Sequence, residues 1–162
     1  MLSSDNTDGM ILKFESVEAS NAVVKKARDI GGDKREKIKV SVATSDGGYI
    51  VGGSITSKSI DLENGINIEG PDNTIEYGIL IKYNKNEECE WVKVLKGSDV
   101  NITSIVECKD KSYIVGGEVD GYTLDAGNGK KINNLSGDSG FLIKYTNIGN
   151  CEWAKAFKGW RF

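Results

Sequence analysis

The sequence repeats itself at a spacing of 62 to 64 residues, and this internal repeat constrains the fold more than any other feature. Three motifs recur: YIVGG, an apolar stretch that ends in Ile-Lys-Tyr, and the triplet Cys-Glu-Trp. Their two copies begin at positions 49 and 113, 78 and 140, and 89 and 151. A degenerate copy of the second motif starts at Gly9. The chain therefore carries half a unit followed by two full units.

Each full unit has the pattern of four strands joined by glycine-rich turns, such as Asp46-Gly47-Gly48. The stretch 77–83 is apolar almost throughout, which is typical of a strand covered on both faces. We therefore predict an all-β fold of stacked, antiparallel, four-stranded sheets. The expected strands are 38–44, 49–55, 77–83 and 89–95 in the first unit, and 102–108, 112–119, 140–145 and 151–157 in the second.

Glycine pairs at 52–53 and 116–117 are expected to end strands. They do not open helices, so they are not phosphate-binding loops of the Walker or Rossmann type.

A lysine, a glutamate and a tryptophan recur in every full unit. Pairing Ile81 with Trp91 across a hairpin places Lys82 opposite Glu90, and the second unit repeats the arrangement with Lys144 and Glu152. Opposite charges across a strand pair stabilise it and fix its register. We interpret these residues as a pairing code, with a catalytic Lys/Glu pair as the alternative. Trp91 and Trp153 are interpreted as packing elements between units, with stacking on a sugar ring as the alternative.

The connections at 56–76 and 120–139 are long for a compact domain, and long loops often carry function. Both contain Asp and Asn ahead of glycine, a composition that suits either tight turns or a calcium site. The candidate ligand-binding residues are Asp61, Asn64, Asp125 and Asn128. A glycosidase would instead need two carboxylates about 5–9 Å apart, for which Asp61, Glu63 and Asp125 are the nearest candidates.

Composition removes several functional classes. The chain has no histidine, so it lacks His-based acid/base catalysis, catalytic triads and His-ligated zinc. The net charge is −3 and basic residues are scattered, which argues against nucleic acid. No apolar run is long enough for a membrane helix, and the N-terminus has no signal-peptide pattern. We predict no cofactor, no metal and no catalytic residue. The three cysteines are read as small, half-buried apolar residues.

The segments 47–53, 59–65, 78–83 and 90–97 resemble the bacterial β-propeller repeats of long surface or secreted proteins, especially those of clostridia-like bacteria. This resemblance implies four-stranded blades: a half blade at 9–32 and full blades at 37–97 and 101–159, within one repeat domain spanning 1–162. About two and a half blades make an incomplete propeller, because closed propellers have four to eight.

The resemblance implies a cell-surface or secreted location. It also implies a fragment or truncated member of a longer repeat protein, or a chain that self-associates to complete a ring. The expected function is a non-enzymatic binding or scaffolding surface, since the family has no agreed catalytic motif. The alternatives are a carboxylate-dependent glycosidase or lyase, and a calcium-dependent carbohydrate-binding module.

Overall fold

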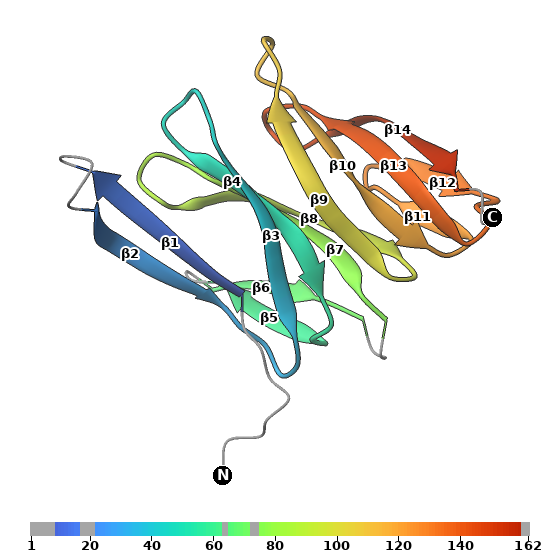
Figure 1. Cartoon of the computed structure of the whole chain (residues 1–162), viewed down its shortest axis with the longest axis horizontal. Helices are drawn as coiled ribbons and strands as arrows, with labels where there is room; N and C mark the ends of the chain where they lie inside the picture. The colour runs from blue at the N-terminus through green and yellow to red at the C-terminus, as the bar shows by residue number, and fades with distance from the viewer. Residues whose placement is uncertain (1–8, 17–21, 63–64, 72–74, 160–162) are drawn as a thin grey trace.

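The computed structural model describes residues 9–16, 22–62, 65–71 and 75–159, and this part of the chain is built from β-strands without helices. All strand pairs are antiparallel, which confirms the predicted all-β fold. The strands form consecutive sheets that lie in a row from the N-terminus to the C-terminus, as Figure 1 shows. The described sheets do not close into a ring or a barrel.

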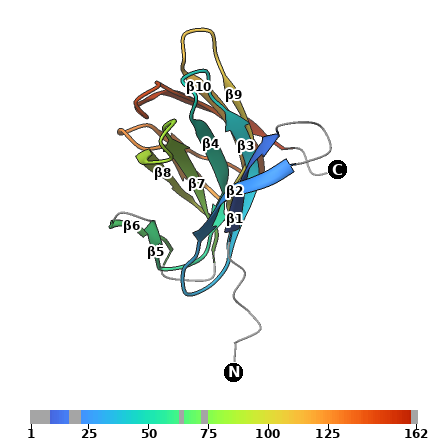
Figure 2. The same ribbon diagram turned by 90° about the vertical axis from the view of Figure 1, so that its left-hand side faces the viewer.

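The row starts with a hairpin and continues with two larger sheets. The hairpin pairs β1 (Gly9–Ser16) with β2 (Ala22–Ile30). The first sheet contains, in order, β3 (Glu36–Ala43), β4 (Tyr49–Ile55), β7 (Tyr77–Tyr83) and β8 (Cys89–Gly97). The second sheet contains β9 (Val100–Glu107), β10 (Tyr113–Asp120), β13 (Asp138–Tyr145) and β14 (Cys151–Lys158). Figure 2 looks along the row and shows the hairpin in front of the first sheet.

The predicted strands agree closely with the observed ones, and 49–55 and 77–83 coincide with β4 and β7. One prediction about the glycines is wrong. Gly52, Gly53, Gly116 and Gly117 lie inside β4 and β10 and do not end them. The reason is packing: a glycine inside a strand lets a neighbouring side chain approach the backbone closely.

The long connections are not open loops. Residues 59–62 and 66–69 form the hairpin of β5 (Ser59–Leu62) and β6 (Ile66–Glu69). In the second unit, β11 (Thr123–Asp125) and β12 (Lys131–Asn133) form the corresponding hairpin. β11 also pairs with β8, so the second unit's hairpin extends the first sheet to six strands.

Two apolar layers hold the row together. One lies between the N-terminal hairpin and the first sheet and includes Val51, Ile79 and Ile81. The other lies between the two sheets and includes Ile50, Leu80, Ile102, Phe141 and Ile143. β7 is therefore buried on both faces, as its unbroken apolar sequence predicts. The described residues contain no helix of the length and hydrophobicity needed to cross a bilayer.

Candidate functional site

The interface between the first and second sheets is built around three glycines of the first sheet. An added Cβ at Gly52 would lie 2.7 Å from Ile102 Cγ2, and at Gly78 it would lie 2.9 Å from Val100 Cγ1. At Gly97 it would lie 2.7 Å from Val100 Cγ2. Since real Cβ contacts are essentially never shorter than 3.0 Å, each glycine leaves a socket that a β9 side chain fills. We call Gly52, Gly78 and Gly97 the glycine sockets of the first sheet.

Two hydrogen bonds hold the start of β9 in these sockets. The Val100 amide donates to the Glu76 carbonyl at 2.8 Å, and the Glu76 amide donates to Asp99 Oδ1 at 3.1 Å. Asp99 adopts a positive φ of 49°, a conformation that aspartate tolerates better than most residues. Val100 and Ile102 are fully buried as a result.

The β11–β12 hairpin closes the same interface from the side. Leu124 pairs with Gly97 and Asp125 with Lys96. An isolated bridge from Ile60 to Gly32 places β5 against the end of β2 in the equivalent way. The hairpin in the long connection of each full unit therefore contacts the outermost strand of the preceding unit.

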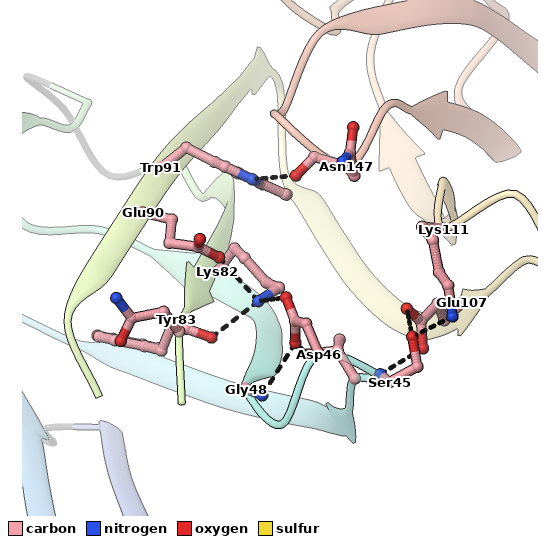
Figure 3. Close-up of polar contacts among 12 residues, drawn as sticks. Ser45, Asp46, Gly48, Lys82, Tyr83, Glu90, Trp91, Glu107, Lys111 and Asn147 are labelled. Carbon is pink, nitrogen blue, oxygen red and sulfur yellow. Dashed lines mark hydrogen bonds and ion pairs between the residues drawn. The ribbon is translucent and has the colours of Figure 1, made fainter. Parts of the chain in front are cut away.

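A buried lysine marks the turn end of the interface. Lys82 Nζ donates to Asp46 Oδ2, Glu90 Oε2 and the Tyr83 carbonyl at 2.8, 2.8 and 2.9 Å (Figure 3). Its side chain is only 1% exposed, whereas both carboxylates reach solvent. Three acceptors compensate for the desolvation of the ammonium group, as a buried charge requires.

The predicted contact between Lys82 and Glu90 is present, but the predicted register is wrong by one residue. Lys82, not Ile81, lies opposite Trp91, and a β-bulge follows between Lys82 and Tyr83. Glu90 is the bulged residue and has no partner in the ladder, but the Glu90 side chain still contacts Lys82. The second sheet repeats the bulge, with Lys144 opposite Trp153.

The second unit repeats the ion cluster in a more open setting. Lys144 Nζ lies 3.0 Å from Asp110 Oδ2 and 2.9 Å from Glu152 Oε2, and its side chain is 21% exposed. Hydrogen bonds from Ser112 and Lys144 lower the pKa of Asp110 to about 2. The sequence-equivalent lysines thus make the same two carboxylate contacts and differ in how well a neighbouring unit covers them.

Stability should fall at acid pH through Asp46. The Lys82 ammonium, helped by the Thr44 hydroxyl, holds the pKa of Asp46 well below its value of 3.8 in an unfolded chain. The contribution to stability is therefore complete above about pH 4 and is lost as the pH falls toward the folded pKa. We expect Asp46→Asn to flatten the pH dependence of the urea midpoint below about pH 4. An unchanged slope in this variant would contradict the assignment.

Trp91 packs across the interface, in agreement with its interpretation as a packing element. Its ring lies 6.0 Å from the Tyr113 ring and 6.4 Å from the Tyr145 ring, and its Nε1 donates to the Asn147 carbonyl at 2.9 Å. Figure 3 shows this bond above the lysine cluster. An added Cβ at Gly149, which has a φ of 82°, would lie 2.8 Å from Trp91 Cδ2.

A further polar bridge joins the turns of the two sheets. The Ser45 amide and hydroxyl donate to the Glu107 carboxylate at 2.8 and 2.7 Å, and Lys111 Nζ donates to Ser45 Oγ at 2.6 Å. Figure 3 shows these contacts to the side of the lysine cluster.

The candidate ligand residues of the long connections lie on separate hairpins. Asp61 is in β5, which pairs with β6, and Asp125 is in β11, which pairs with β8 and β12; Figure 1 shows the two hairpins in different parts of the row. Asp125 accepts the Gly127 amide and pairs with Lys131, and Asn128 accepts the Cys151 amide. These contacts are those of structured turns. Asn64 and Glu63 lie outside the described residues. Among the described residues, no group of three or more His, Cys, Asp or Glu side chains is arranged to hold a metal ion.

The cysteines are free thiols. Cys89 and Cys108 are half-buried and Cys151 is buried, where desolvation raises the pKa of its thiol. A raised pKa disfavours the reactive thiolate.

The second sheet has an outer face, turned away from the first, and the glycines on that face are the feature that sequence reasoning did not single out. Phe141 and Ile143 point into the core, so the residues between them point outward. Ladder partners share a face, which places Val106 with Ile114, Leu142 with Gly116, and Phe157 with Gly140. Val106, Leu142 and Phe157 are exposed apolar side chains. The repeated glycines were the available signal, because Gly116, Gly140 and Gly159 match the three sockets of the first sheet.

No family model matches the chain, and no curated protein matches it significantly.

Proposed function

We propose that the chain is a non-enzymatic stack of β-propeller-like blades that acts as a binding or scaffolding surface. Its binding element is the outer face of the second sheet, and the occupant is another blade of the same repeat type. The observation that carries this proposal is a difference between equivalent residues. Leu80 is fully buried by the second sheet, whereas Leu142, its counterpart, is 37% exposed.

Other equivalent positions support the same conclusion. Leu95 is fully buried in the first sheet, and its counterpart Phe157 is 57% exposed. β7 is buried along almost its whole length, whereas buried residues alternate with exposed or half-exposed ones in β13. Several exposed apolar side chains on one face of a sheet favour an interaction site there.

The polar residues that recur in each blade support a packing role. Lys82 binds both Asp46 and Glu90, and Trp91 is held between the sheets. These contacts explain why the residues recur in each unit, so no catalytic role is needed to explain the recurrence.

Association through the exposed face tests this function. An uncovered apolar face should make the chain associate as its concentration rises. We expect the weight-average mass from light scattering to increase with concentration for the natural sequence. It should stay at the monomer value for Leu142→Glu combined with Phe157→Glu.

Tyr122→Glu is the matched control, since Tyr122 is exposed but lies in a connection outside the outer face. It should associate like the natural sequence. A natural chain that stays monomeric at every concentration, or a double variant that associates as strongly, would contradict the proposal.

A further inference from the structure

The outer face of the second sheet repeats the glycines that receive β9 on the first sheet, but in the described residues no side chain from another unit fills them. An added Cβ at Gly140 would meet only the Gly117 carbonyl oxygen, at 3.9 Å. Its counterpart Gly78 is in close contact with Val100. At Gly116 the nearest atoms belong to Ser104, Leu142 and Phe141, all within the second sheet.

A hollow of about 690 Å³ lies at this position and is lined by Asn101, Glu118, Ser139 and Gly140, among others. Asn101 Oδ1 is the buried side-chain acceptor that has no hydrogen-bond partner among the described residues. A buried acceptor without a partner is costly, and a donor from an incoming strand would satisfy it.

The edge of the second sheet is open in the corresponding way. In the first sheet, Lys96 and Gly97 at the end of β8 pair with β11. In the described residues, β14 pairs with β13 alone. Its last residue, Lys158, and the following Gly159 are the counterparts of Lys96 and Gly97. A strand with a free edge can accept another strand through its backbone groups.

This inference rests on the proposed function. We propose that the second sheet binds another repeat unit at two places, the glycines of its outer face and the edge at the end of β14. Gly140 and Gly116 would receive the apolar side chains at the start of that unit's first strand, as Gly78 and Gly52 receive Val100 and Ile102. The end of β14 would pair with the unit's short hairpin. The partner is thus a sheet whose first strand carries Val-x-Ile and whose long connection forms a Thr-Leu-Asp-type hairpin.

The test is a chain extended by a copy of its own second unit. Residues 1–159 are followed directly by a second copy of 98–162, so that Gly159 precedes Ser98 as Gly97 does in the natural sequence.

The hollow is acidic, with Glu118, Asp120 and Asp138 around it. These carboxylates would repel Asp99 of the added copy. The experiment is therefore run in roughly 1 M salt, where a Debye length of about 3 Å screens this repulsion.

Amide hydrogen exchange, read by mass spectrometry on β13 and β14, measures docking. We expect exchange in these strands to slow by roughly tenfold or more in the extended chain compared with the natural chain. Gly140→Val supplies the matched control, because it fills the socket. It should remove the gain in the extended chain and leave exchange in the natural chain unchanged.

Equal exchange of β13 and β14 in the two chains would overturn the proposal, whether or not the added unit is folded. Slower exchange that persists in the extended chain with Gly140→Val would also overturn it. Failure here, together with loss of association in the Leu142→Glu, Phe157→Glu variant, would leave the exposed face as a binding surface with a different occupant. If association through the face also fails, the proposed function fails with it.

Discussion

Alanine at Gly78 should destabilise the chain, whereas alanine at Gly140 should not, although the two glycines are equivalent in sequence. The new methyl group at position 78 would lie 2.9 Å from Val100 Cγ1 and 3.1 Å from Leu95 Cβ, both fully buried side chains. Overpacking of this kind costs about 1–3 kcal/mol. At position 140 the methyl group meets one atom at 3.9 Å, an ordinary contact.

For Gly140→Ala, the change in unfolding free energy could even have the opposite sign. Glycine inside a strand is less favourable than alanine by roughly 0.5–1 kcal/mol, since glycine loses more backbone entropy on folding. Gly140→Ala should therefore be neutral or slightly stabilising. Urea unfolding of both variants measures the difference. Equal losses of unfolding free energy would mean that the outer face of the second sheet is as crowded as the face of the first sheet that the second sheet covers.

Neutralising both carboxylates around Lys82 should have the largest effect on stability. In Asp46→Asn with Glu90→Gln, the ammonium group stays buried with no charged partner. Leaving a buried charge without its partner costs roughly 3–5 kcal/mol. We expect the free energy of unfolding at neutral pH to fall by that order, as measured by urea titration. The double variant should recover stability as the pH rises and Lys82 loses its proton, because the folded state then binds fewer protons than the unfolded chain.

Asp110→Asn with Glu152→Gln is the matched variant in the second sheet. Lys144 makes the same two contacts but reaches solvent, so water replaces the lost carboxylates. A much smaller loss is expected than in the first sheet, because solvent screens exposed ion pairs. Losses of similar size in the two double variants would show that burial by the second sheet does not distinguish the two clusters.

Much of the fold follows from the sequence because the repeat shows each strand twice. The apolar runs at 49–55 and 77–83 have the length of strands and correspond to β4 and β7. The contact between Lys82 and Glu90 was predictable from their recurrence. Its register was not, because a β-bulge adds one residue to β8 and pattern alone does not reveal which residue the ladder skips.

The site was harder to predict because it depends on tertiary contacts between units. The sequence pattern places Gly52 at a strand end, Gly78 inside a strand and Gly97 after one. None of these positions indicates that β9 fills the space above them. The connections at 56–76 and 120–139 read as loops because β5, β6, β11 and β12 are only three or four residues long. Such short strands are stabilised by pairing with a neighbouring unit, which no local propensity encodes.

Hydroxyl-radical footprinting of the monomer at low concentration tests whether the outer face of the second sheet is open. It reads the solvent access of Leu80, Leu95, Leu142 and Phe157 in one experiment by mass spectrometry. We expect clear modification of Leu142 and Phe157 and protection of Leu80 and Leu95, their covered counterparts. Equal protection of all four side chains would contradict the claim that the second sheet presents an open face.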